Sequence, residues 1–383
     1  MSTFRGKGER PLKEDRITLY NVGDIILGPD PEPLFSEVRK TLEEADVLVG
    51  QLEVPHTTRD AEAMALGRHP DNLSPLVTNG FDLVTMAGNH LMDAGPAGVE
   101  DTIAWLDARG IAHVGAGMNL SEARRPAVLE RKGVRIGYLD YNCVGPKKTW
   151  ASEQRPGNAY VHVVTHYELD HDTPGGPPVI YTWATMESTE AMAEDIRALR
   201  ERCDVLVVAF HKGIAHTPVK IAQYERQVAR AAVDAGADLV VAHHAHILKG
   251  IEIYRGKTIF HGLGNFVTWA PFLAPSPDGD PDSWAMRRIE LFGFRPDPEY
   301  PTYPFHPEAI YTMIAVAEIE DGRIVRTGYK PCIVNKAGKP VPVSRKDGGE
   351  TVFAYVEDIT RKAGLNARFA WASDDFAVCL EGE

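Results

Sequence analysis

The sequence has little cysteine, and this scarcity excludes two kinds of scaffold. Its four cysteines are scattered through 383 residues without any CxxC spacing: Cys143, Cys203, Cys332 and Cys379. A disulfide framework needs closely spaced pairs, and a zinc ribbon needs two CxxC motifs. The four residues are therefore expected to be small, buried apolar side chains.

A basic excess and long apolar runs are also missing. The 41 Lys and Arg residues face 54 Asp and Glu residues, and the resulting net charge of −13 argues against a nucleic-acid partner. Residues 1–16 are polar, without the apolar stretch of a signal peptide or membrane anchor. The sequence predicts a cytoplasmic protein without a membrane partner, with a polar tail at 1–16 and one domain at 17–383.

What the sequence does contain, from residue 17 to 253, is an alternation of short apolar runs and longer amphipathic stretches, which is typical of a layered α/β domain. Six runs predict buried strands: ITLYNVG, ADVLVG, FDLVTMAG, VRIGYLDY, DVLVVAF and ADLVVAH. The spacing of apolar residues predicts helices at 34–44, 98–108, 189–200 and 223–235.

Two segments interrupt this pattern. Residues 145–178 are rich in Gly, Pro and polar residues, and 271–307 combine prolines with aromatic residues, as in FGFRPDPEYPTYPF. Because proline removes ladder hydrogen bonds, neither is a central strand, and we expect ordered insertions over the functional site or plain surface loops. After Ile310, TMIAVAEIEDGRIVRTGYKP predicts a hairpin that turns at EDGR, and 351–362 predicts a final helix.

Metal-ligand residue types follow the apolar runs in five segments, NVGD, GQLE, AGNH, AFHKG and AHHAH. Each residue alone has a more ordinary interpretation, as a turn former, a solvated charge or a hydrogen-bonded histidine. In AHHAH, an extended backbone would direct the imidazoles of His244 and His246 to one side. Their joint occurrence at predicted strand ends favours one site, because α/β folds place chemistry there. The candidates are Asp24, Glu53, Asn89, His90, His211, His244 and His246.

The ordered motifs resemble the CapA family, named for poly-γ-glutamate capsule synthesis and belonging to the metallophosphoesterase-like (calcineurin-like) superfamily. The resemblance runs over roughly 18–267, through NVGDIILG, QLEVP, NGFDLVTMAGNHLMDAGPAGVEDTIAWLDARGIAHVGAG, AFHKG, DAGADLVVAHHAHILKGIE and IFHGLGNFV. It implies an αββα sandwich of two mixed β-sheets flanked by helices, with His90 as the catalytic imidazole. The implied metal ligands are Asp24, Glu53, Asn89, His211, His244 and His246.

Carboxylates, an amide oxygen and imidazoles form a mixed set that suits one or two divalent Mn, Fe or Zn ions better than calcium. Glu53 is the natural bridge between two such ions, which at roughly 3.5–4 Å apart would lower the pKa of a shared water. His90 would then protonate the leaving group or stabilise charge on the reacting oxygen. Asp93 either orients this imidazole or caps the following helix.

The chain also departs from the pattern of its resemblance. Ile26 stands where metallophosphoesterases usually carry a histidine, so a second ion is expected to bind more weakly than the first. Lys212 replaces a common tryptophan, and Ala215 and His216 replace an acidic and aromatic pair, which argues for a substrate unlike that of the capsule proteins. His261 either reaches the site or packs. The residues expected to bind an anionic substrate are Arg68, Lys212 and His216, with ordinary surface or packing roles as the alternative.

These features predict a metal-dependent hydrolase that acts on a small anionic substrate. Phosphoester cleavage and cleavage of a carboxylic amide or ester both stay open, as does a homo-oligomeric state. The aromatic residues of 292–305 motivate a cyclic or aromatic substrate. The alternative from another class is a non-catalytic protein that binds or assembles capsule polymer.

Overall fold

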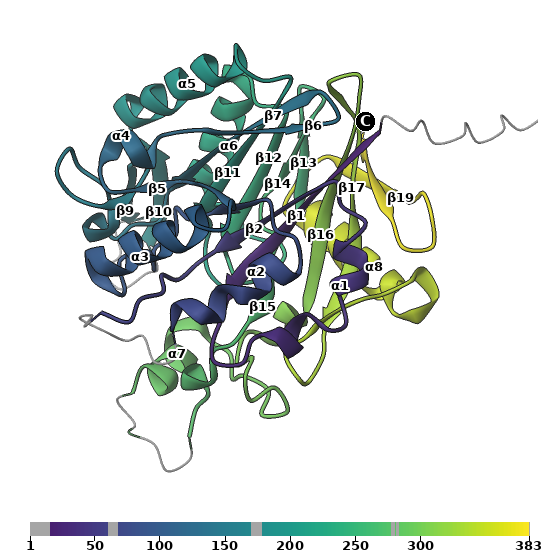
Figure 1. Ribbon diagram of the computed structural model, residues 1–383. Helices are drawn as coiled ribbons and strands as arrows, with labels where there is room; N and C mark the ends of the chain where they lie inside the picture. Colours follow the sequence, from purple (N-terminus) through teal and green to yellow (C-terminus); the bar gives the residue numbers. More distant parts are fainter. Residues whose placement is uncertain (1–15, 60–67, 170–177, 277–279, 281–282, 383) are drawn as a thin grey trace, which may run out of the picture.

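The computed structural model describes residues 16–59, 68–169, 178–276, 280 and 283–382 (Figure 1). The tail expected at 1–16 lies outside the described residues except for Arg16.

The larger of two main sheets is mixed and contains both the first and the last strand of the chain. Its strands are β1 (Ile17–Ile26), β2 (Val47–Leu52), β3 (Leu83–Thr85), β4 (Ala112–Val114), β15 (Asn265–Thr268), β16 (Tyr311–Glu320), β17 (Arg323–Val334), β18 (Pro340–Pro342), β19 (Ala367–Trp371) and β20 (Ala377–Glu381). They follow the order β19-β20-β17-β16-β1-β2-β3-β4, with β15 paired to β1 and β18 to β17. Strands β1 to β4 run parallel, and β1 pairs antiparallel with β16.

The smaller main sheet is also mixed. Its strands are β6 (Ala127–Arg131), β7 (Val134–Asn142), β11 (Val205–Lys212), β12 (Leu239–His244), β13 (Ile251–Tyr254) and β14 (Lys257–Phe260). They follow the order β13-β14-β12-β11-β7-β6, in which β7, β11, β12 and β14 run parallel. The carboxyl ends of β11 and β12 therefore lie at one edge of this sheet.

Helices and short paired strands complete the chain. The α-helices are α1 (Arg39–Leu42), α2 (Ser74–Thr78), α3 (Gly95–Asp107), α4 (Leu120–Ala123), α5 (Met186–Arg200), α6 (Gln223–Ala235), α7 (Trp284–Phe292) and α8 (Gly349–Lys362). Single turns of 3₁₀ helix span Glu32–Phe35, Pro70–Leu73, Lys147–Thr149, Pro271–Leu273, Pro307–Ile310 and Arg345–Asp347. Two small sheets pair β5 (Ala116–Gly117) with β8 (Gly157–Asn158) and β9 (Val163–Leu169) with β10 (Pro178–Ala184).

The two main sheets and the helices on their outer faces form four layers, with an apolar core between each pair of neighbouring layers. Each sheet contributes to two cores, because alternate residues of a strand point to opposite faces. Between the sheets, Leu19 of β1 and Val207 of β11 belong to one core, which α8 joins through Val356. A second core joins the outer face of the larger sheet to α1, α2 and α3, and a third joins the smaller sheet to α5 and α6. Figure 1 shows α5 and α6 side by side over β7 and β11. The predicted αββα sandwich of two mixed sheets is confirmed.

Several expectations about single elements can be compared with the structure. The hairpin expected at EDGR is present, with β16 and β17 joined by Asp321 and Gly322, both at positive φ. The helix expected at 34–44 was wrong in its bounds: a 3₁₀ turn from Glu32 to Phe35 precedes the short α1, since prolines 31 and 33 lack backbone donors. Its apolar residues Val38 and Leu42 are nevertheless buried.

In the described part of the segment 145–178, strand β9 lies away from the candidate site, whereas Asn158 contacts the loop after β3 that carries Asn89. Strand β9 pairs with β10, and β10 packs against α6 on the outer side of the smaller sheet. All four cysteines are free; Cys143, Cys203 and Cys332 are buried as expected, whereas Cys379 is half-buried. Within the described ranges, no helix is both long and apolar enough to cross a membrane.

Candidate metal centre

Oxygen and nitrogen ligands reach the candidate metal centre from different sheets. The larger sheet contributes Asp24 near the end of β1, Glu53 just after β2, and Asn89 in the loop after β3. The smaller sheet contributes His211 in β11 and His244 at the end of β12, with His246 two residues later. The structure thus brings together all six ligands that the resemblance implies, and we call this set the candidate metal centre.

The first group in this centre is Asp24, Glu53 and His246, whose ligand atoms all lie within 4.8 Å of one another. Both carboxylates are buried, with exposed fractions of 0% for Asp24 and 1% for Glu53. His246 Nε2 lies 3.3 Å from Glu53 Oε1, and His246 Nδ1 lies 3.5 Å from Asp24 Oδ2. Asp24 Oδ1 and Glu53 Oε2 have no hydrogen-bond partner among the described residues. Buried carboxylate oxygens without a partner are costly, so this group fits a divalent cation.

The pKa values in this group show the same need for positive charge. Burial and the neighbouring Glu53 carboxylate raise the pKa of Asp24 well above its usual range. Burial also disfavours the Glu53 anion, but the His246 imidazole outweighs it and holds the pKa of Glu53 below its usual range. Burial opposes the charged form of His246 as well, yet Glu53 raises the pKa of His246 to about 9. A proton on His246 thus supplies part of the charge that a cation would supply.

The second group is Asn89, His211 and His244. Asn89 Oδ1 lies 2.7 Å from His211 Nε2 and 3.3 Å from His244 Nδ1. Burial and the His244 ring lower the pKa of His211 well below its usual value, and burial with the His246 ring lowers the pKa of His244 to about 3. Both imidazoles are therefore neutral, which is the form that coordinates a metal.

Three histidines at this site have left-handed backbones: His216 at φ 55, His244 at φ 87 and His246 at φ 53. For a residue other than glycine this conformation is strained, and such strain is typical of functional sites. The reason given from the sequence for the convergence of His244 and His246, an extended backbone, was wrong. The chain instead turns sharply after β12, and the two ring centroids lie 6.0 Å apart.

Two residues that the sequence did not single out hold the loop that carries Asn89. Asp140 Oδ2, at the end of β7, accepts a hydrogen bond from Ala87 N at 2.7 Å. The Asn158 side chain donates to Gly88 O at 2.9 Å. Both partners come from distant parts of the chain, so local sequence gave no signal for them.

Asn265 positions His246 and was also not singled out. Its Oδ1 accepts a 2.8 Å hydrogen bond from His246 Nδ1, which leaves Nε2 facing Glu53. A polar partner on the second nitrogen is usual for a metal-bound imidazole. A Cβ on Gly23 would lie 2.0 Å from Gly264 O, so glycine at 23 permits the close approach that places Asn265 opposite Asp24. The GLGNFV motif, which contains Asn265, was the sequence signal that could have identified this residue.

His90 and its partners lie on the open side of the centre. The His90 side chain is 36% exposed, its Nδ1 lies 2.7 Å from Asp93 Oδ2, and its Nε2 lies 4.0 Å from Glu53 Oε1. Asp93 thus orients the imidazole; helix α3 follows Ala94 and has no side-chain cap. Arg68 is 8% exposed, with Nη1 3.8 Å from the same Asp93 oxygen.

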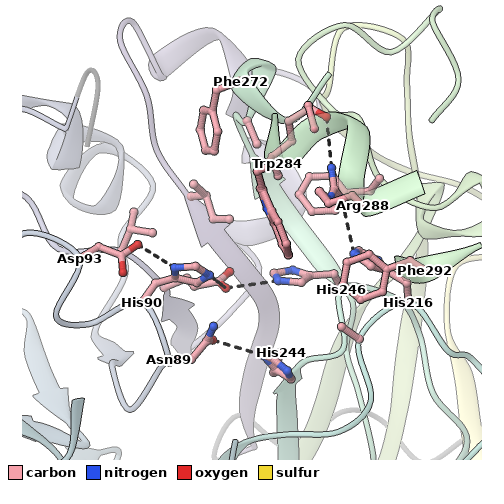
Figure 2. Close-up of a pocket in the computed structure, with 18 of the residues that line it drawn as sticks. Asn89, His90, Asp93, His216, His244, His246, Phe272, Trp284, Arg288 and Phe292 are labelled. Carbon is pink, nitrogen blue, oxygen red and sulfur yellow. Dashed lines mark hydrogen bonds and ion pairs between the residues drawn. The ribbon is translucent and has the colours of Figure 1, made fainter. Parts of the chain in front are cut away.

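A pocket of about 380 Å³ opens above the centre and has one aromatic side. Figure 2 shows Trp284 projecting toward His90 and His246, with Phe272 beyond it. Arg68, His90 and His216 line the pocket, as does Ile26 in the place of the usual histidine. The segment 270–305, which follows β15, contributes the apolar lining residues Ala270, Phe272, Leu273, Trp284, Ala285, Phe292 and Phe305.

Lys212 does not line the pocket, although it was expected to bind substrate. Since it follows His211 in β11, it points to the opposite face of the sheet, toward α6. Its Nζ lies 3.0 Å from His261 Nδ1 and 3.6 Å from Glu225 Oε2. His261 therefore packs behind the site, where its Nε2 bonds Glu252 at 3.0 Å. We call this buried set the Lys212 network: Lys212, Glu225, Lys249, Glu252 and His261.

The layered sheets and the buried centre at their shared edge define an αββα sandwich of two mixed sheets with a candidate divalent-metal site. The family model described as "Bacterial capsule synthesis protein PGA_cap" matches residues 15–269, and the chain belongs to this family. The resemblance seen in the motifs is thereby confirmed.

Two curated relatives carry names that refer to capsule polymer. The chain is 28% identical to the PGA biosynthesis protein CapA of Bacillus subtilis (strain 168) over 283 residues, which covers 69% of this chain and 67% of that protein. It is 26% identical to the capsule biosynthesis protein CapA of Bacillus anthracis over 282 residues, which covers 69% of this chain and 63% of that protein. The aligned part therefore spans about two thirds of the relatives' own length.

Two solved structures match the chain at low similarity. The calcineurin-like phosphoesterase YfkN from Bacillus subtilis matches 91% of this chain and 97% of that chain, at 15% identity and a TM-score of 0.39. A hypothetical protein from Thermus thermophilus matches 82% and 98%, at 14% identity and a TM-score of 0.43. The fold class accordingly rests on the sheet topology of the chain itself.

Proposed function

We propose that this protein is a metal-dependent hydrolase that uses a metal-activated water on a small anionic substrate. The observation that carries this proposal is the pair of buried carboxylates with unpartnered oxygens, Asp24 and Glu53, of which Glu53 lines the pocket together with His90. A site for metal storage or structure would have no need of an exposed imidazole beside it.

The ligand set fits one or two Mn, Fe or Zn ions, with Asp24, Glu53 and His246 in one group and Asn89, His211 and His244 in the other. Bound there, such ions would lower the pKa of a coordinated water and polarise the oxygen of the substrate. Glu53 belongs to the first group and also lies close to the second. Its carboxylate therefore favours the charged form of both His246 and His211 and acts to raise the pKa of each.

The proposed chemistry of the chain's own residues centres on His90. Its Nδ1 bonds the Asp93 carboxylate, which fixes the orientation of the ring and leaves Nε2 toward the pocket. The imidazole can then donate its Nε2 proton to a leaving group. Arg68 lines the same end of the pocket and provides positive charge for an anionic substrate. The aromatic side chains of 272–305 exclude water around the reacting bond.

The test combines metal analysis with a substrate panel. Purified protein is stripped with a chelator, reloaded separately with Mn²⁺, Fe²⁺ or Zn²⁺, and assayed on phosphoesters and on carboxylic amides and esters. We expect turnover only after reloading, and the preferred class of the panel identifies the bond that is cleaved.

The names of the relatives favour a second function, the non-catalytic binding of capsule polymer. If fully loaded protein turned over no panel member but bound poly-γ-glutamate tightly, this second function would replace the first.

A further inference from the structure

Within the described part of the chain, helix α7 places a buried cation without an acidic partner at the aromatic side of the pocket. Of its two consecutive arginines, Arg287 is exposed and Arg288 is 4% exposed. Burial lowers the pKa of Arg288 to about 10, and no carboxylate of the described residues counteracts this shift. A buried charge without a counterion is unfavourable, so an anion that binds beside it would gain a strong partner.

The guanidinium still has donors available for such an anion. Arginine carries five N–H groups. Two on Nη1 donate to Leu273 O and Pro304 O, each at 3.2 Å, and Nη2 lies 3.5 Å from His216 Nε2. Among the described residues, this leaves the Nε–H and one Nη2–H unassigned, which is enough to hold a carboxylate through two hydrogen bonds.

The surroundings of Arg288 are apolar and lie next to the candidate metal centre. Its guanidinium carbon is 5.8 Å from the centroid of Phe305, and Phe292, Phe272 and Trp284 line the same pocket. His216 stands between Arg288 and the centre, because its ring also stacks on His246 at 5.8 Å. In Figure 2, Arg288 lies on the far side of Trp284 from Asp93.

We propose that Arg288 binds the carboxylate of a substrate that carries an aromatic or bulky apolar group, while the bond to be cleaved lies over the candidate metal centre. A single positive charge in an apolar wall matches a monoanionic carboxylate better than a dianionic phosphate. This inference rests on the proposed function for the position of the cleaved bond, but the carboxylate subsite itself is independent of the metals.

The test measures binding rather than turnover and uses chelator-treated protein. Isothermal titration calorimetry compares 3-phenylpropanoate with propanoate, which lacks the ring, and with 3-phenylpropanamide, which lacks the charge. Arg288→Met removes the guanidinium, Arg288→Lys keeps a charge without the paired donors, and Arg287→Met is the matched control on the same helix. Circular dichroism verifies the fold of each variant.

We expect wild-type and Arg287→Met protein to bind 3-phenylpropanoate more tightly than either other probe. Arg288→Met should lose about 10–100-fold in affinity, the usual effect of removing a charged hydrogen-bond partner. Arg288→Lys should be intermediate, and this comparison suffices if Arg288→Met does not fold. Equal affinity of wild-type and both Arg288 variants, or equal affinity for the amide and the carboxylate, would overturn the inference. Failure of the hydrolase proposal would appear separately, as absent turnover in reloaded protein with these affinities unchanged.

Discussion

Two buried polar clusters meet at strand β11 and differ in how completely their charges are balanced. His211 and Lys212 are consecutive and both fully buried, but alternation along the strand sends them to opposite faces. In the Lys212 network, Lys249 Nζ lies 3.3 Å from Glu225 Oε1, and Arg230 from the surface pairs with Glu252. Glu225 Oε2 lacks a hydrogen bond, but Lys212 Nζ lies 3.6 Å from it. On the other face, the carboxylates of Asp24 and Glu53 keep unpartnered oxygens, and their ion-pair partners among the described residues are histidines rather than lysine or arginine.

This difference separates a structural cluster from one that fits a ligand. A buried charge network whose members satisfy one another needs nothing further, and its role is to hold the elements that carry it. A cluster of equal burial whose acceptors outnumber its donors is stable only when an external cation or proton completes it. Burial alone would have ranked both clusters equally as functional sites.

The largest expected effect is the loss of metal when a ligand is removed from the incomplete cluster. His246→Ala should lower metal affinity by more than about 100-fold, since even the loss of a supporting residue costs about 10–100-fold. Elemental analysis after gel filtration measures the metal content per chain. Lys212→Met is the control and should keep its metal; full occupancy in His246→Ala would remove this residue from the ligand set.

The next effect concerns His90, the proposed general acid beside the candidate metal centre. His90→Asn should keep the metals but slow the reaction by about 10²–10⁴-fold, or roughly 3–5 kcal/mol of transition-state stabilisation, because a general acid is lost. Steady-state kinetics on the preferred substrate and on an analogue with a better leaving group measure this loss. The analogue should recover part of it. An emptied metal site in His90→Asn would instead make His90 a ligand.

Breaking the balanced cluster should destabilise the fold. Lys212→Met leaves the buried Glu225 without part of its charge balance, and removing one partner of a buried pair typically costs about 3–5 kcal/mol. Urea denaturation measures the free energy of unfolding. If the variant lost less than about 1 kcal/mol, the network would not have the structural role that its contacts indicate.

The smallest expected effect is a pH dependence that only the metal-free protein shows. Because Glu53 raises the pKa of His246 to about 9, this pair stabilises the metal-free fold fully below about pH 6.5 and loses that contribution as pH rises through 9. The change should be at most about 3 kcal/mol, at 1.36 kcal/mol per pKa unit. Thermal unfolding of chelated and reloaded protein between pH 6 and 10 measures it. A bound cation replaces the proton, so equal slopes in both forms would contradict this assignment.

The sequence predicted most of the central strands, and the six residues that it proposed as ligands lie together in the structure. Both signals come from short contiguous motifs at strand ends, such as NVGD and AGNH. The sequence did not show where β11 ends: the predicted run DVLVVAF stops at Phe210, but the strand continues to Lys212, so alternation sends Lys212 to the face opposite the candidate ligand His211. The turn after His244 depends on φ values that no local pattern signals. Arg288 gave no signal at all, since its importance arises from burial by distant residues.

The division of ligands between the two sheets has a mechanical consequence. Apolar packing in the core that contains Leu19 and Val207 is non-directional and allows one sheet to slide slightly over the other. Coordination bonds have narrow ranges of length and angle. An ion held by Asp24 from one sheet and His246 from the other would therefore fix the position of the two sheets relative to each other. The spacing of the sheets then sets the ionic radius that fits, and core substitutions far from the pocket should shift the preference among Mn²⁺, Fe²⁺ and Zn²⁺.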